Sequence, residues 1–123
     1  MKKYVDGFLL VIPKNKVEEY KKMAIMGRDA WMKHGALGYY ECKGDDLEPQ
    51  EMGGIKPPSF LEVKDASVDE NVWFSFIIFK SKEHRDEVNK KVMSEMDESM
   101  RGVEIPFDMK RISYGGFEVE VEG

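Results

Sequence analysis

Residues 71–79, NVWFSFIIF, place large apolar side chains in both phases of a β-strand. Strand side chains alternate between two faces, and water usually covers one face of a small antiparallel sheet. In this stretch Phe74 and Phe76 point to one face. Trp73 and Ile77 point to the other face. Both faces of the strand therefore need an apolar cover, which a single layer of helices cannot supply.

The predicted elements follow the order β-α-β-β-α-β. Alternation and β-forming residues predict strands at residues 4–12, 36–43, 71–79 and 109–121, and apolar spacings of three to four residues predict helices at 15–35 and 82–100. This order is typical of an α+β, ferredoxin-like fold with a four-stranded antiparallel sheet. The length of 123 residues suits one domain, which we assign to residues 1–123.

Single residues predict where the helices begin and end. Asn15 and Glu18 have the spacing of a capping box at the start of the first helix. Gly35 stands where a left-handed residue ends that helix, and Ser81 is placed to cap the second one.

The last predicted strand contains two adjacent glycines, Gly115 and Gly116. Tyr114 before them and Phe117 after them fall in opposite phases of the strand. One extra residue reverses the alternation, so we predict a β-bulge at these glycines.

Residues 44–71 form an acidic insert without periodicity. Eight acidic residues and two lysines give the insert a net charge of −6, so the rest of the chain carries +1. Long irregular segments are usually functional lids or connectors. We predict a solvated, irregular loop in which residues 59–64 (SFLEVK) pair briefly as an edge strand.

Charge and cysteine content exclude several classes of protein. The net charge of −5 and the pI near 5.1 argue against a nucleic-acid partner, because such proteins carry a concentrated basic surface. No stretch approaches the ~18–20 apolar residues that span a bilayer, so we expect no membrane partner. The single cysteine, Cys42, cannot form an internal disulfide and favours a cytoplasmic location. We predict that Cys42 is a small core residue.

No strong catalytic motif occurs in the sequence. The chain has neither a phosphate-binding loop nor a Gly-x-Ser-x-Gly nucleophile elbow. His34 and His84 lie fifty residues apart without other metal-ligating residues at short spacing, so we predict no metal site and no cofactor.

The predicted topology leaves one face of the sheet without cover. Both helices lie on the same face, yet the first strand also carries apolar side chains on both sides, for example Leu9 and Leu10. Such an apolar face exceeds the patch that monomers normally expose. We therefore predict a homodimer in which the two sheets pack together about a two-fold axis.

Four blocks of the sequence resemble a known family: YVDGF, WMKHGALGYYECKGDD, HRDEVNKKVM and FDMKRISYGGF, in this order. Together they are similar to a bacterial domain-of-unknown-function family of small proteins in the dimeric α+β barrel superfamily. The resemblance covers nearly the whole chain. It implies the ferredoxin-like fold and a back-to-back dimer.

The superfamily also includes cofactor-independent monooxygenases, which use a pocket between the sheet and the helices. Trp31, His34 and Tyr39 cluster around the end of the first helix and the following turn, and they are candidate ligand-binding residues. His34 is also a catalytic candidate, because an imidazole can act as a general acid or base. Alternatively, Trp31 is a core residue and His34 is a helix-terminal residue favoured by the helix dipole.

A second group of candidates begins the second helix. His84 and Arg85 lie where the helix dipole disfavours a cation, so an acidic partner or a bound anion would explain their placement. Pairing with Asp86 or Glu87 is the simpler explanation.

A third group flanks the predicted bulge. Bulges often direct side chains toward sites, so Arg111 and Tyr114 are candidate ligand-binding residues and Tyr114 is the second catalytic candidate. Asp108 is placed to pair with Arg111 across the turn.

Three functions follow from these residues. The first is binding of a small apolar or aromatic ligand in a cleft between sheet and helices. The second is a cofactor-independent monooxygenase or isomerase that acts in the same cleft, and the third is a non-catalytic interaction module. A cleft lined by Trp31, Tyr39, Arg111 or Tyr114 favours the first two, whereas a filled cleft favours the third.

Overall fold

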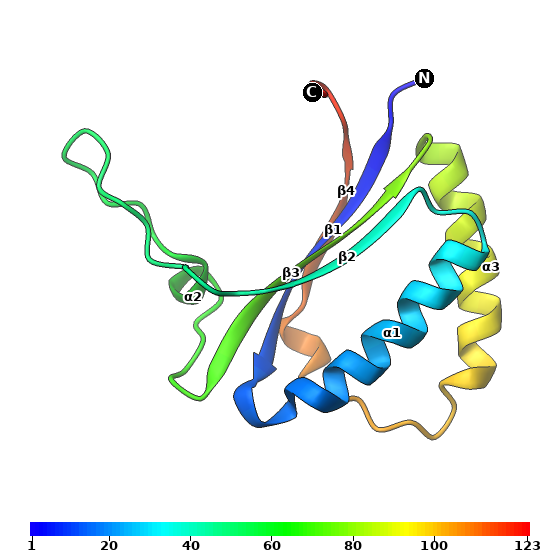
Figure 1. Ribbon diagram of the computed structural model, residues 1–123, viewed down its shortest axis with the longest axis horizontal. Helices are drawn as coiled ribbons and strands as arrows, with labels where there is room; N and C mark the ends of the chain where they lie inside the picture. The colour runs from blue at the N-terminus through cyan, green and yellow to red at the C-terminus, as the bar shows by residue number, and fades with distance from the viewer.

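The computed structural model describes residues 1–123. Strands β1 (Tyr4–Pro13), β2 (Gly38–Lys43), β3 (Glu70–Phe79) and β4 (Ser113–Glu118) form one antiparallel sheet in the order β2-β3-β1-β4. Helices α1 (Val17–Lys33) and α3 (Lys82–Ser99) lie on one face of this sheet (Figure 1). The predicted order of elements and the four-stranded antiparallel sheet are confirmed.

The core fills the space between the two helices and the sheet. Its largest fully buried side chains are Phe79 of β3, Ile12 of β1, and Val88 and Val92 of α3. Trp73 is also buried there, with 3% of its surface exposed. One phase of β3 thus packs under the helices, as the apolar pattern requires.

The two helices begin by different means. The predicted cap of α3 is confirmed, because Ser81 Oγ accepts a hydrogen bond of 3.1 Å from the backbone N–H of His84. The predicted capping box of α1 is wrong. Residues Lys14–Lys16 form a turn of 3-10 helix directly after β1, so Asn15 lies inside this turn and Lys16 occupies the cap without a side-chain hydrogen bond. Gly35 ends the α1 region with a positive φ of 106°, as predicted.

The predicted bulge in β4 is wrong. Pairing between β1 and β4 runs without interruption from Tyr4–Glu118 to Leu9–Ser113. No reversal of phase is needed, because Tyr114 pairs with Phe8 and Phe117 pairs with Val5, so the two aromatic side chains lie on opposite faces of the sheet. The strand ends at Glu118. Glu120 lies beyond the strand and pairs with Lys2 at 2.8 Å, so it never competes for a face of the sheet.

The other side of the sheet, here called the open face, remains apolar. Phe74, Tyr40 and Phe117 lie on it and are 48%, 51% and 61% exposed. Tyr40 stacks on Phe76 with ring centroids 4.8 Å apart. The prediction that Cys42 is a core residue is wrong. Cys42 is exposed because it pairs with Phe74 of β3 and its side chain lies on the open face.

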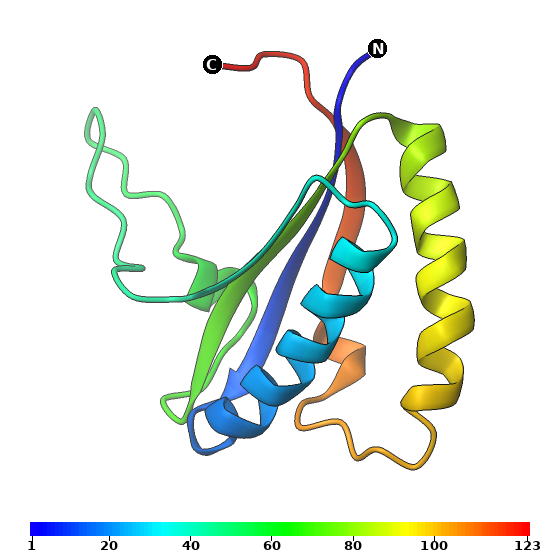
Figure 2. The ribbon, with the colours of Figure 1, turned by 45° about the vertical axis from the view of Figure 1, so that its right-hand side comes forward.

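The acidic insert contains a short helix, α2 (Phe60–Val63), where an edge strand was predicted. The strand prediction is wrong because Ser59 Oγ accepts a hydrogen bond of 3.1 Å from the backbone N–H of Glu62, which caps a helical turn. Residues 45–58, here called the arm, project from the open-face side of the domain, away from α1 and α3 (Figures 1 and 2).

The region around α2 crosses one end of the open face. Lys64 Nζ donates a hydrogen bond of 2.6 Å to Ser113 Oγ, and Arg111 donates to the Lys64 carbonyl at 3.2 Å. Because β2 and β4 are opposite edges of the sheet, the insert spans the width of the sheet. Val11 and Val72, which pair at this end, are only 3% and 2% exposed. The chain therefore covers part of its open face and leaves the rest in solvent.

Candidate functional site

A cavity of about 290 Å³ lies between the covered face of the sheet and the two helices. Most of its lining is apolar, and it includes Ala24 of α1, Met93 and Met96 of α3, and Phe107 after α3. Ligand pockets commonly combine such apolar walls with a few polar groups. This cavity lies in the region for which the ligand-binding cleft is predicted.

The polar part of this cavity is centred on Glu41 of β2. Its carboxylate accepts hydrogen bonds from Tyr20 Oη at 2.9 Å, from Tyr39 Oη at 2.8 Å, and from Ser75 Oγ. The three donors come from α1, β2 and β3. All four residues line the cavity, so one carboxylate joins a helix and two strands at its wall.

The two tyrosines stay protonated in this environment. Burial raises the pKa of Tyr20 and the pKa of Tyr39 well above the ordinary value, and the negative charge of Glu41 raises both further. Both hydroxyls therefore act as donors to Glu41. Tyr20 Oη lies within hydrogen-bond distance of both carboxylate oxygens, 2.9 Å from Oε1 and 3.1 Å from Oε2, and its single proton can serve only one of them fully.

Gly27 explains how Tyr39 reaches Glu41. A glycine in the middle of a helix costs about 1 kcal/mol relative to alanine. Here a Cβ on Gly27 would lie 2.6 Å from Tyr39 Oη. Because Gly27 has no side chain, the Tyr39 hydroxyl can lie against α1 and reach Glu41.

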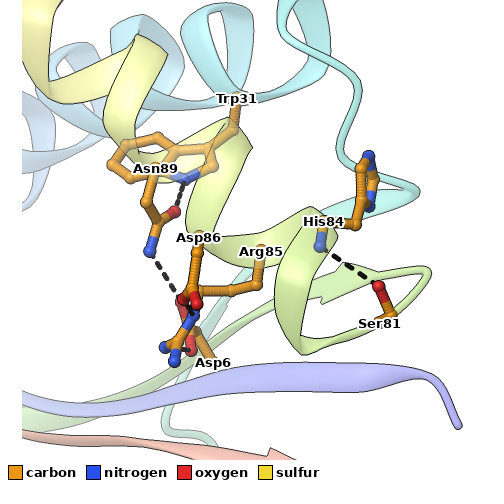
Figure 3. Close-up of polar contacts among 7 residues, drawn as sticks. All are labelled: Asp6, Trp31, Ser81, His84, Arg85, Asp86 and Asn89. Atoms are coloured by element: carbon orange, nitrogen blue, oxygen red, sulfur yellow. Dashed lines mark hydrogen bonds and ion pairs between the residues drawn. The ribbon is translucent and has the colours of Figure 1, made fainter.

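A second polar group ties both helices to β1 (Figure 3). Asp6 pairs with Arg85 Nη1 at 2.7 Å and accepts a hydrogen bond of 3.2 Å from Asn89 Nδ2. Asn89 Oδ1 in turn accepts a hydrogen bond of 2.9 Å from Trp31 Nε1. Arg85 also pairs at 2.8 Å with Asp86, one of its two predicted partners. These polar groups satisfy one another, so the network stabilises the packing of α1 and α3 on the sheet.

The structure brings two of the predicted site residues to the cavity. Trp31 and Tyr39 both line it, with ring centroids 5.9 Å apart. His34 lies outside the cavity, where its Nε2 is 2.5 Å from Glu95 Oε2 of α3. The hydrogen bonds from His34 and Lys33 lower the pKa of Glu95.

The remaining predicted site residues also lie outside this cavity. His84 Nδ1 accepts a hydrogen bond of 3.0 Å from the backbone N–H of Lys80, at the start of α3. Tyr114 is 77% exposed and stacks on Phe8 with ring centroids 5.7 Å apart.

Arg111 anchors the insert instead of lining the cavity. It pairs with Glu70 at 2.6 Å and lowers the pKa of that carboxyl. The predicted partner, Asp108, instead accepts a hydrogen bond of 3.0 Å from the backbone N–H of Lys110.

Sequence reasoning missed Glu41, Tyr20 and Ser75. Glu41 and Ser75 occupy strand positions whose phase points toward the helices, and Tyr20 lies on the buried side of α1, so this phase was the available signal. Their meeting depends on the β2–β3 register, which pairs Glu41 with Ser75.

No cluster of three or more His, Cys, Asp or Glu residues with the arrangement of a metal site occurs in residues 1–123. None of the helices combines the length and the hydropathy required to cross a membrane.

Two solved structures share the fold of this chain. Both are described as dimeric ferredoxin-like proteins from an uncultured marine organism. Their TM-scores are 0.60 and 0.58 at 11% and 7% identity, and each comparison covers 100% of this chain and 98% or more of the other. At these identities the likeness shows the fold alone.

Sequence comparison gives a closer relationship. The chain is 39% identical over 116 residues to the Uncharacterized protein YbaA of Escherichia coli (strain K12), which covers 94% of this chain and 95% of the relative. The YbaA protein of Shigella flexneri matches with the same identity and coverage. A family model described as Protein of unknown function (DUF1428) matches residues 3–109. With most of its length matched by this model and by the YbaA proteins, the chain belongs to the DUF1428 family.

Proposed function

We propose that this protein binds a small, mainly apolar molecule in the cavity between the sheet and the helices. The observation that carries the proposal is the cavity of about 290 Å³ with Glu41 at its wall. A core without a ligand-binding role is normally packed to crystal-like density, with few voids larger than a water molecule. Apolar walls around one carboxylate favour a ligand that is aromatic or aliphatic and has one hydrogen-bond donor.

Glu41 supplies the selectivity in this proposal. Tyr20, Tyr39 and Ser75 donate to its carboxylate, and an N–H or O–H group of the ligand can take the place of the longer Tyr20 contact, 3.1 Å from Oε2. Hydrogen bonds to a charged group contribute about 1.5–3 kcal/mol. A ligand with a donor should therefore bind more tightly than one of the same shape without it.

Indole and benzofuran are a matched pair of probes for this test, because only indole carries an N–H. We expect indole to bind about tenfold more tightly in a calorimetric titration, and we expect Glu41→Gln to reduce this preference. Ala24→Phe should fill the cavity and abolish binding of both probes. If neither probe binds, or if Ala24→Phe leaves their binding unchanged, the proposal is wrong.

The proposal includes a homodimer that packs through the open face. Three aromatic side chains on this face, Phe74, Tyr40 and Phe117, are about half exposed or more. The solved structures with this fold are described as dimeric, which supports the same arrangement here. Sedimentation at micromolar concentration should give twice the mass of one chain, and a monomer would contradict this part of the proposal. The single cysteine supports a cytoplasmic location.

A cofactor-independent monooxygenase or isomerase has less support than ligand binding. Its catalytic candidates were His34 and Tyr114, and neither lines the cavity. The open cavity also favours ligand binding over a purely structural interaction module. Oxygen uptake with a panel of quinols would separate the enzyme from the binding protein.

A further inference from the structure

The arm has a defined shape although it extends away from the rest of the domain. At its tip Met52 and Ile55 exchange backbone hydrogen bonds of 2.8 and 3.0 Å. Gly53 and Gly54 between them have φ angles of 58° and 81°, which a two-residue hairpin turn requires. Behind the tip, Lys56 pairs with Glu48. The tip of the arm is therefore a two-residue hairpin turn, and the rest of the arm has no further β-pairing.

The tip of the arm presents apolar side chains to solvent. Met52 and Ile55 are 69% and 71% exposed. The rest of the arm is acidic and carries four carboxylates: Asp45, Asp46, Glu48 and Glu51. Apolar side chains at the end of a projecting hairpin are typical of a contact that another surface completes.

The base of the arm is continuous with the open face. Leu47 of the arm, Phe60 of α2 and Phe74 of β3 line one hollow of about 210 Å³. A second hollow, of about 530 Å³, extends from Phe60 and Phe74 across the sheet to Phe117. The open face and the arm are thus two sides of one concave apolar surface.

The arm lies on the side of the sheet where a second copy would pack. In both views of the ribbon it extends from the open-face side, opposite the helices (Figures 1 and 2). We propose that the arm packs along the second copy of this chain, so that each protomer of the dimer is held by the arm of the other. This inference depends on the homodimer of the proposed function. In a two-fold dimer both arms make the same contact, so one contact surface is used twice.

Charges placed at the tip test this inference. The double variant Met52→Asp/Ile55→Asp would carry two carboxylates into the contact, and we expect its dimer dissociation constant to rise about tenfold or more. A dilution series in sedimentation equilibrium measures this constant. Val68→Asp is the matched control, because Val68 belongs to the same insert, is 85% exposed and lies outside the arm. The control variant should have the same dimer dissociation constant as the unmodified chain.

The outcomes separate this inference from the dimer itself. If Phe76→Asp abolishes the dimer and the arm variant has an unchanged constant, the dimer stands and the role of the arm is wrong. If the unmodified chain is a monomer, both are wrong. A photo-crosslinking residue at position 55 gives a second readout. It should join two chains covalently, and cross-linking within one chain only would overturn the inference.

Discussion

The two faces of the sheet differ in what covers their apolar side chains. On the face under the helices, apolar side chains are buried by α1 and α3, and the acidic groups Glu41 and Asp6 are surrounded by donors from other elements. On the open face, aromatic side chains such as Tyr40 and Phe117 are more than half exposed.

We therefore expect the covered face to determine the stability of one chain and the open face to determine the association of two chains. The covered face has contacts that are completed within one chain, so changes there should unfold the domain or alter the cavity. The open face lacks such contacts over much of its area, so changes there should alter association. Neighbouring residues on one strand can test this, because alternation assigns them to different faces.

The largest expected difference is between Ile77 and Phe76, adjacent residues of β3. Ile77→Asp would bury an unpaired carboxylate at a position that is 3% exposed, and we expect a loss of more than about 4 kcal/mol in the free energy of unfolding. Phe76→Asp should leave a folded monomer, since its side chain lies on the open face. Urea unfolding and sedimentation measure the two effects. If both variants lose the same free energy of unfolding, the expectation that only the covered face determines stability is wrong.

The next effect concerns the two acidic partners of Arg85. Asp6→Ala removes a carboxylate whose side chain is 6% exposed, and breaking a buried pair typically costs about 3–5 kcal/mol. Asp86→Ala removes the other partner, which is 61% exposed, and should cost less than about 1 kcal/mol. Urea unfolding of both variants gives the comparison. Similar losses would mean that Asp6 contributes no more than a surface ion pair.

A smaller effect is expected from the tyrosines at Glu41. Burial, with the charge of Glu41, raises the pKa of Tyr20 and of Tyr39 in the folded state. The unfolded chain releases these protons at about pH 10, so stability is complete below that pH and falls as the pH rises above it. Each tyrosine contributes a slope approaching about 1.4 kcal/mol per pH unit.

The double variant Tyr20→Phe/Tyr39→Phe should therefore lose stability less steeply at alkaline pH. Urea unfolding between about pH 9 and about pH 11 measures the slope. Tyr40→Phe is the control, because Tyr40 neighbours Tyr39 on β2 but lies on the open face. An unchanged slope in the double variant would show that Glu41 and burial do not hold the two protons.

Local sequence patterns predicted the helices and strands better than they predicted the contacts between them. Ser81 caps α3 as expected, because a cap depends on residues only three positions apart. The bulge prediction failed because it required the apolar residues of β4 to share one face, whereas Tyr114 and Phe117 lie on opposite faces of the sheet. His34 was grouped with Trp31 from proximity in the sequence. The helix turns His34 toward Glu95 of α3 instead, a contact that is sixty-one residues away in the chain.

The sequence by itself determined the order of elements and the existence of two apolar faces, because both follow from the periodicity of side chains along the chain. The tertiary structure alone decided that Glu41, Tyr20, Tyr39 and Ser75 meet at one cavity and that the insert crosses the sheet to Arg111. The physical reason is that periodicity assigns a residue to a face, whereas a contact between elements also requires their register and packing. Those depend on side chains far apart in the sequence.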